Sequence, residues 1–246
     1  MLRIYFYRIN ETELDAKRER ALSVLPLWRV EKYSRMIPRS GKLLSLAAGL
    51  LLRHGLLDTL GTELKELEIA FNRHEKPCLT GKMLEGKGQF DPVYFNLSHA
   101  GEYVALAVSD IQVGIDIETK QDPGHGVAEH VFNEEEREAM KASEDPERYF
   151  TRLWTRKEAY VKCTGTGITV PLNEFSVLED TVRAADLKAE GDRKAEGDKK
   201  AEGENKEEGI YQIRTLRETP EYALSVCVRS KTFPKFSLDI VGQFSI

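Results

Sequence analysis

The apolar positions of the first half predict a strand followed by a long buried helix. Residues 1–10 alternate apolar and polar positions and are rich in aromatic side chains, which is typical of a strand. Apolar residues between 40 and 57 recur around most of a helix, so this helix should be covered on several sides. Its most apolar run, residues 43–52, stops at Arg53 and is well short of the roughly 20 residues that a membrane-spanning helix needs. We therefore expect a central buried helix and no membrane partner.

From residue 93 the periodicity becomes that of short strands. Three β-rich segments separated by turn residues read VYFNL, YVALAVS and VGIDIE. A capping pattern then predicts a helix over residues 134–141, and Asp145-Pro146 begins a second helix that runs to Gly165. Strands that close the sheet are expected in FSVLE, IYQIRTL, YALSVCV and FSLDIV. The order of strands and helices indicates an α+β fold.

A charged repeat interrupts this pattern at residues 188–209. It reads KAEGDR, KAEGDK, KAEGEN and KEEG, and it offers no side chain larger than Ala to an apolar core. A solvated, mobile loop between two strands is therefore the favoured interpretation. A β-helix would need apolar inward positions that this repeat lacks.

Composition and charge exclude several classes of protein. The 246 residues are 41% hydrophobic and 31% charged, which excludes collagens, rods and wholly disordered chains. The net charge of −5 gives no global basic field for nucleic acid, so any anion site must be local. The three cysteines lack metal-binding or disulfide spacing, and the N-terminus lacks the apolar core of a signal peptide. We expect a cytoplasmic protein.

Asp116 and Glu118 form the first candidate site. In the strand VGIDIE alternate side chains share a face, so these carboxylates project together while Ile115 and Ile117 enter the core. Two adjacent carboxylates repel unless a cation lies between them, and hard oxygen ligands suit Mg²⁺. An exposed strand face with two acids would look the same, so both interpretations stay open.

The second candidate site lies on the helix that ends at Gly165. Spacings of three, four and eight residues place Lys157, Glu158 and Lys162 on the same side as Trp154. An ordinary amphipathic helix with a Glu–Lys pair would show this pattern too. Together the two sites are more specific, because Glu158 could add a third carboxylate and Lys162 could meet a phosphate held by the metal.

Two further segments could bind an anion. Ser98 and His99 supply a hydroxyl and a ring nitrogen at the end of a predicted strand, although a lone His more often has a structural hydrogen bond. Residues 28–39 carry several bases among apolar positions. A solvated helix face would account for that basic stretch equally well.

Four motifs in order give a family resemblance. FNLSHAGEYVALAVS, VGIDIE, LWTRKEAYVKCTGTGI and PLNEF together resemble the surfactin-synthetase type of 4'-phosphopantetheinyl transferase, in the branch with the helix motif WxxKEAxxK. The motifs span residues 95–175, and a weaker similarity covers the EKYSRM segment and the leucine-rich helix. Nearly all of the chain outside the repeat is thus accounted for.

The resemblance implies a fold and a ligand. The fold is a pseudo-symmetric tandem of two α/β halves, with coenzyme A in the cleft between them and Mg²⁺ on its pyrophosphate. Residues 1–110 would form the N-terminal half with part of the coenzyme A site. Residues 111–246 would form the C-terminal half with the metal site, including a disordered insertion at about 184–209.

The resemblance also implies roles for individual residues. Asp116, Glu118 and Glu158 match the metal ligands, and Glu158 is also the candidate base for the carrier serine. Lys162 matches the lysine that neutralises the pyrophosphate. Glu75 departs from the family, which commonly has Gly before its Lys-Pro pair. The expected coenzyme-binding residues are Lys32, Arg35, Lys42, Lys76, Ser98, His99, Lys157 and Lys162.

The implied reaction is group transfer to a carrier protein. The serine hydroxyl of an acyl or peptidyl carrier protein would attack the β-phosphorus of coenzyme A and release adenosine 3',5'-bisphosphate. Such chemistry needs alignment and charge neutralisation more than a protein nucleophile. One chain would supply both halves of the cleft, so we expect a monomer.

Two alternatives stay open. A Mg²⁺-dependent hydrolase of nucleotide pyrophosphates would use water in place of serine. A non-catalytic coenzyme A or carrier-binding module would keep the fold without the reaction. Product analysis with and without a carrier separates these possibilities.

Overall fold

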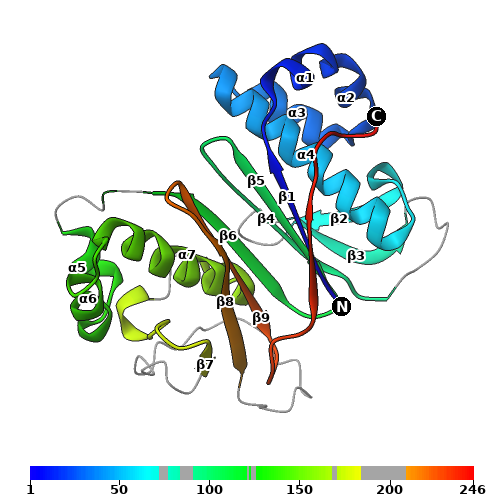
Figure 1. Cartoon of the computed structure of the whole chain (residues 1–246). Coiled ribbons are helices and arrows are strands. Elements are labelled where there is room, and N and C mark those ends of the chain that lie inside the picture. The colour runs from blue at the N-terminus through cyan, green and yellow to red at the C-terminus, as the bar shows by residue number, and fades with distance from the viewer. Residues whose placement is uncertain (72–76, 84–90, 121, 123–125, 168–170, 184–208) are drawn as a thin grey trace, which may run out of the picture.

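The computed structural model describes residues 1–71, 77–83, 91–120, 122, 126–167, 171–183 and 209–246 (Figure 1). Two α+β units face each other, and each combines a four-stranded sheet with a long helix. The expected low-complexity insertion lies outside the described residues, apart from its last residue.

The sheet of the first half is built from both ends of the chain. Its strands, in spatial order, are β10 (Phe236–Ile240), β1 (Leu2–Arg8), β5 (Tyr103–Ser109) and β4 (Tyr94–Ala100). β10 runs parallel to β1, whereas β5 is antiparallel to both β1 and β4. The last strand therefore completes the first half, and the division of the chain at residue 110 stays a prediction.

The described part of the first half contains four α-helices and the short 3₁₀ helix Leu64–Glu66. The α-helices are α1 (Glu11–Ala16), α2 (Arg18–Val24), α3 (Leu27–Arg35) and α4 (Arg39–Leu60). The expected buried helix is α4, which packs on β5 and shares its apolar cluster with Tyr5 and Leu106. By length and composition alone α4 could cross a membrane, but most of its apolar window is buried inside the protein, as in a core helix.

The second half repeats the plan of a sheet covered by a long helix. Its strands, in spatial order, are β6 (Val113–Thr119), β9 (Tyr222–Arg229), β8 (Ile210–Glu218) and β7 (Thr181–Arg183). Its helices are α5 (Val127–Val131), α6 (Glu134–Lys141) and α7 (Pro146–Thr164). The predicted caps are present, since Asn133 caps α6 in a capping box and Asp145 caps α7.

Two smaller features differ from the sequence prediction. A hairpin of β2 (Leu67–Phe71) and β3 (Pro77–Met83) was not expected. The predicted strand FSVLE is wrong, because residues 175–179 follow the short 3₁₀ helix Leu172–Glu174 without entering a sheet. Its backbone groups bond to side chains instead, as when Arg156 donates to the carbonyl of Val177.

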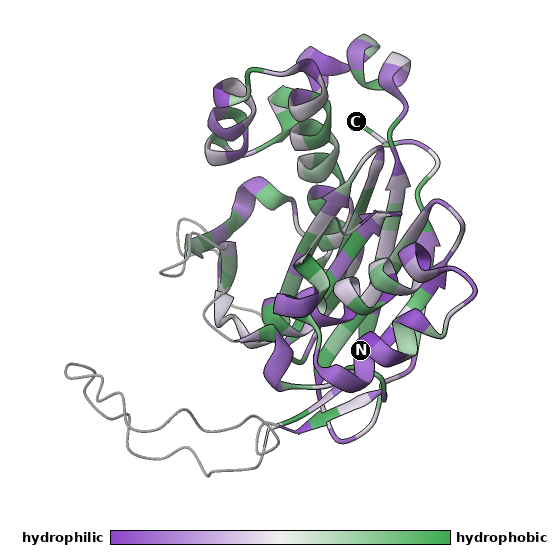
Figure 2. Ribbon diagram, turned by 90° about the vertical axis from the view of Figure 1, so that its left-hand side faces the viewer, coloured by the Kyte–Doolittle hydropathy of each residue, from purple (hydrophilic) through white to green (hydrophobic). Residues whose placement is uncertain are grey.

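A separate apolar cluster joins the two sheets. It contains Ile4 and Ala105 from the first sheet and Ile115, Ile117 and Leu224 from the second. Figure 2 shows largely hydrophobic positions along these central strands, with hydrophilic positions on outer helices. β4 and β6 lie close together at this junction, so the two candidate segments of the sequence lie side by side.

Candidate functional site

A glycine allows α7 to lie directly on β6. A Cβ at Gly114 would come within 2.1 Å of the carbonyl oxygen of Ala159 and 2.4 Å of the nitrogen of Cys163, distances that no side chain tolerates. Only glycine fits so close an approach of helix to strand. It sets the acidic residues of β6 beside Glu158 and Lys162 of α7.

Asp116 is the most enclosed acid of this group, with 2% of its surface exposed. Its Oδ1 accepts hydrogen bonds from Ser98 Oγ at 2.8 Å and from Lys162 Nζ at 2.5 Å. Burial raises the pKa of Asp116, and the charge of Lys162 opposes that shift. Its Oδ2 is buried and has no hydrogen-bond partner among the described residues. A buried carboxylate oxygen without a partner favours a cation at this position.

The charge of Asp116 raises the pKa of both Glu118 and Glu158. Burial, and then the charge of Asp116, raises the pKa of Glu118 to about 7, while the charge of Lys162 and a hydrogen bond from Trp154 oppose the shift. Burial and the same aspartate also raise the pKa of Glu158. Mutual repulsion of this kind is relieved by a cation among the carboxylates.

The metal site itself stays a prediction. Among the described residues, no three His, Cys, Asp or Glu side chains are arranged closely enough to hold a metal ion. The donor chemistry nevertheless fits Mg²⁺, because the three acids supply hard oxygens and one of those oxygens lacks a partner. Asp116, Glu118 and Glu158 would hold the ion.

Basic side chains line a cavity on the β4 side of this acidic group; we call this lining the basic wall, and Asp116, Glu118 and Glu158 the acidic wall. The cavity, of about 720 Å³, lies among α3, α4 and β4, and Lys32, Arg35 and His99 line it as expected. Its only acid among the described lining residues is Glu31, whose carboxylate lies 3.8 Å from Arg35. The cavity therefore suits an anionic ligand.

Arg29 is the residue of this cavity that the sequence analysis did not select. Only 4% of Arg29 is exposed, and burial lowers its pKa to about 10. One Nη donates to the carbonyl of Ser45, whereas Nε has no hydrogen-bond partner among the described residues. Trp28 Nε1 and Ser45 Oγ line the same cavity and also lack partners there. Three unpartnered polar atoms around one cavity indicate a polar ligand.

Electrostatics couple the two walls. Partial burial, followed by the charges of Lys162 and Lys32, lowers the pKa of His99. Partial burial and the charge of Arg29 lower the pKa of Lys32. Cations that lower one another's pKa in this way are stabilised by an anion placed among them.

Three expected coenzyme-binding residues are placed differently or not at all. Lys157 is a correction, because its side chain is fully buried inside the second half and its ammonium cannot reach the cleft. Lys42 does not line the cavity; its ammonium lies 5.6 Å from the ring centre of Tyr33. Lys76 lies outside the described residues, although the neighbouring Pro77 lines the cavity.

Ser98 connects the two walls rather than lining the cavity. Its hydroxyl donates to Asp116, accepts from Lys162 at 3.0 Å and accepts from the backbone N–H of Ile117. It therefore holds β4 against β6 at the acidic end of the cleft. The sequence motif found this residue, but not its link to the carboxylates.

Two similar α+β units that place a cavity lined by basic side chains next to a group of carboxylates suit a ligand that carries several phosphates. Comparison with known proteins identifies the family. A family model described as the 4'-phosphopantetheinyl transferase superfamily matches residues 112–227, and one described as 4'-phosphopantetheinyl transferase, N-terminal, matches residues 14–111. The chain belongs to the 4'-phosphopantetheinyl transferase superfamily.

Individual relatives agree with this assignment. The chain is 24% identical over 236 residues to the 4'-phosphopantetheinyl transferase Sfp of Bacillus subtilis (strain 168), with 95% of both chains covered. It is 37% identical over 132 residues to the 4'-phosphopantetheinyl transferase psf-1 of Bacillus pumilus, covering 49% of this chain and 57% of that relative. The resemblance to the surfactin-synthetase type, the α+β fold class and the transferase activity they imply are confirmed.

Proposed function

We propose that this protein transfers 4'-phosphopantetheine from coenzyme A to a serine of an acyl or peptidyl carrier protein. The serine oxygen forms a bond to the β-phosphorus, and the bond from that phosphorus to the bridging oxygen breaks. Adenosine 3',5'-bisphosphate leaves with the bridging oxygen, and the serine proton passes to a base. Carrier proteins and coenzyme A are the general partners of this family.

The observation that carries this proposal is the set of unpartnered buried polar atoms on both walls. Arg29, Trp28 and Ser45, each of which has a buried polar atom without a partner among the described residues, line a cavity of nucleotide size, and Asp116 Oδ2 is a further such atom on the acidic wall. Coenzyme A carries phosphates for the first wall, and Mg²⁺ on its pyrophosphate would satisfy the second. Both walls thus gain partners from one substrate.

Different side chains would bind the phosphates, neutralise charge and accept the proton. Arg29, Lys32 and His99 would bind the nucleotide phosphates. Lys162, which contacts Asp116 at 2.5 Å, would donate to the pyrophosphate as charge develops. Glu158 would accept the serine proton, directly or through a water molecule. Bound Mg²⁺ would neutralise charge on the pyrophosphate.

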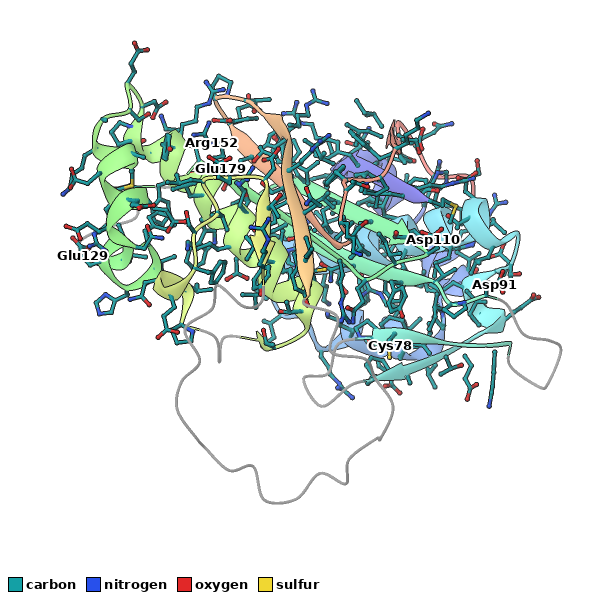
Figure 3. The ribbon with its side chains drawn as sticks, turned by 90° about the horizontal axis from the view of Figure 1, so that it is seen from below. Cys78, Asp91, Asp110, Glu129, Arg152 and Glu179 are labelled. Carbon is teal, nitrogen blue, oxygen red and sulfur yellow. The ribbon has the colours of Figure 1, made fainter. Side chains whose placement is uncertain are left out.

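The alternatives are less well supported. The relatives are named transferases, which does not favour a pyrophosphate hydrolase or a non-catalytic binding module. We further propose that the protein is a monomer, because one chain contributes both the basic and the acidic wall. We also propose a cytoplasmic location, because its three cysteines, among them the exposed Cys78 labelled in Figure 3, are free, as is usual in a reducing compartment.

The decisive variant is Glu158→Gln. We expect no mass increase on apo-carrier proteins incubated with this variant, coenzyme A and Mg²⁺, because the amide can neither take the proton nor hold the metal as a carboxylate does. Calorimetry should show that coenzyme A still binds the basic wall. The measurement is intact-mass analysis of a panel of carriers. Glu138→Gln, which changes an exposed acid paired with Lys141, is the matched control.

Two results would overturn the proposal. One is transfer by Glu158→Gln at the rate of the unaltered protein. The other is full transfer in excess chelator, which would exclude the role of Mg²⁺. Release of nucleotide without modification of any carrier would favour the hydrolase.

A further inference from the structure

A fully buried ion pair lies inside the second half, behind the acidic wall. Lys157 Nζ and Glu136 Oε2 are 2.9 Å apart, and neither side chain has any exposed surface. Burying two charges is often less favourable than packing two apolar side chains of the same volume. Net stability is therefore a poor explanation for this pair, and its geometry offers a better one.

The ammonium of Lys157 has a partner in three directions. Besides Glu136 it donates to the carbonyl of Leu172 at 2.7 Å and to the carbonyl of Phe175 at 2.6 Å. It also lies 4.4 Å from the ring centre of Phe175. Since an ammonium has three N–H donors, this set uses all of them and fixes where the side chain points.

The carboxylate of Glu136 is held as firmly. Its Oε2 accepts the backbone N–H of Asn133 in the capping box of α6, and its Oε1 accepts the backbone N–H of Val177. Glu136 and Lys157 therefore join α6, α7 and the segment 172–177 through directional bonds. We call this pair with its backbone partners the buried hub.

Lys157 directly precedes Glu158 on α7, and this position connects the buried hub to the cleft. Successive side chains on a helix are rotated by about 100°, so fixing one side chain sets the direction of the next. The hub holds the rotation of α7 from inside the second half. Gly114 sets the distance of α7 from β6 on the other side.

We propose that Glu136 is a positioning residue, which through Lys157 fixes the rotation of α7 and so aims the carboxylate of Glu158 at the reacting groups. The inference rests on the proposed function, because it assigns Glu158 to the reaction. Glu136 touches neither substrate nor metal. An apolar pair could fill the same volume but would remove the bond between α7 and α6 and the bonds to the carbonyls of Leu172 and Phe175, leaving only Arg156 to bond α7 to the segment that follows.

The test compares Glu136→Gln, Lys157→Met and the double variant with the unaltered protein. Each single change leaves a buried charge without its partner, so both should lower the thermal unfolding midpoint. The double variant removes both charges at similar volume and should recover most of that loss. Its kcat should nevertheless stay about 10- to 100-fold low, because a displaced catalytic group loses rate without unfolding.

Binding provides the second readout. Calorimetric affinity for coenzyme A in metal-free buffer depends on the basic wall and should stay within about twofold in every hub variant. Arg53→Met is the matched control, since it removes an ion pair with Glu63 in the first half. This control should lower the unfolding midpoint without the loss in kcat.

The possible outcomes separate the inference from the function. A double variant that recovers both the unfolding midpoint and kcat would show that the hub only stabilises the fold. Should the double variant stay unstable, Glu136→Gln alone decides, and a kcat within about twofold of the unaltered protein overturns the inference. If the unaltered protein modifies no carrier, the proposed function fails first, whatever the hub variants do.

Discussion

At the residue scale, Arg29 is a buried positive charge that no described acidic side chain neutralises. It is almost completely buried, its Nε has no hydrogen-bond partner in the described part of the chain, and burial lowers its pKa to about 10. Most buried arginines bond to an acid, because an unpaired buried charge is unfavourable. A phosphate of the substrate would supply the missing interaction. This makes Arg29 the strongest candidate anion contact in the first half.

Arg29→Met should weaken coenzyme A binding by about 10- to 100-fold, the loss expected for one charge-assisted hydrogen bond. The unfolding midpoint should not fall as much as for other buried substitutions, because an unfavourable buried charge is also removed. Calorimetry with coenzyme A and thermal unfolding measure the two effects. Arg39→Met is the control, since that arginine pairs with Glu11 and Asp15 outside the cavity. Equal affinity in both variants would contradict the assignment.

Glu118 makes stability depend on pH in a defined direction. Its pKa is about 7 in the folded protein against an ordinary value of 4.5, chiefly because of burial. The folded state therefore keeps a proton that the unfolded state releases. Its contribution to stability is present below pH 4.5 and is lost as the pH rises through 7.

Glu118→Gln should remove this dependence. In metal-free buffer the unfolding midpoint of the variant, relative to the unaltered protein, should rise between about pH 4.5 and pH 8. Thermal unfolding across that range provides the measurement. A difference between the two proteins that does not change with pH would show that Glu118 titrates normally.

At the element scale, the contact of α7 with β6 decides the geometry of the acidic wall. β6 contributes Asp116 and Glu118, and α7 contributes Glu158 and Lys162. The two elements are far apart in sequence. They can approach each other so closely because Gly114 has no side chain. A change at this glycine alters every distance between the two sets of residues.

Gly114→Ala should lower stability by about 1–3 kcal/mol through overpacking, because backbone rather than a flexible side chain occupies the space. It should also reduce kcat, since α7 must move away from β6. Gly242→Ala is the matched control, because a Cβ there meets nothing within 4 Å. Denaturant unfolding and transfer kinetics measure the two effects. A Gly114→Ala protein as stable as this control would refute the close-packing argument.

At the scale of the whole molecule, the strand order puts the acidic residues of β6 and the described residue Arg183, after which the charged segment follows in the chain, at opposite edges of the second sheet. β6, with its carboxylates, forms one edge of the second sheet, and β7 forms the other edge. The described chain enters the repeat after β7 and leaves it before β8, where Arg183 pairs with Ile210. These two ends are hairpin partners, so a short turn can join them.

Replacing residues 184–209 by an Asn-Gly turn should keep kcat and coenzyme A affinity within about twofold. Two strands separate this edge from β6, and the pairing of β7 with β8 suits a tight turn. Intact-mass assays with several carriers provide the measurement. A loss of transfer to some carriers only would instead assign the repeat a part in partner choice.

Much of the site could be predicted from the sequence because it consists of short, regular patterns. Alternation along VGIDIE put Asp116 and Glu118 on one face, and helical spacing linked Glu158 to Lys162. The same spacing misplaced Lys157, because a helix has no sharp border between its cleft side and its buried side. Lys157 points into the second half because it pairs there with Glu136, which lies 21 positions earlier in the chain.

The sequence alone determined the repeating elements, their caps and the family, since periodicity and motif order are local properties. Only the tertiary structure decided that β10 joins the first sheet, that Arg29 is buried with no carboxylate bound to it among the residues that the structure describes, and that Lys157 points into the second half. Burial and pairing depend on which distant segments meet. Which segments meet depends on the packing of the whole chain, so it cannot be predicted from any single stretch of residues.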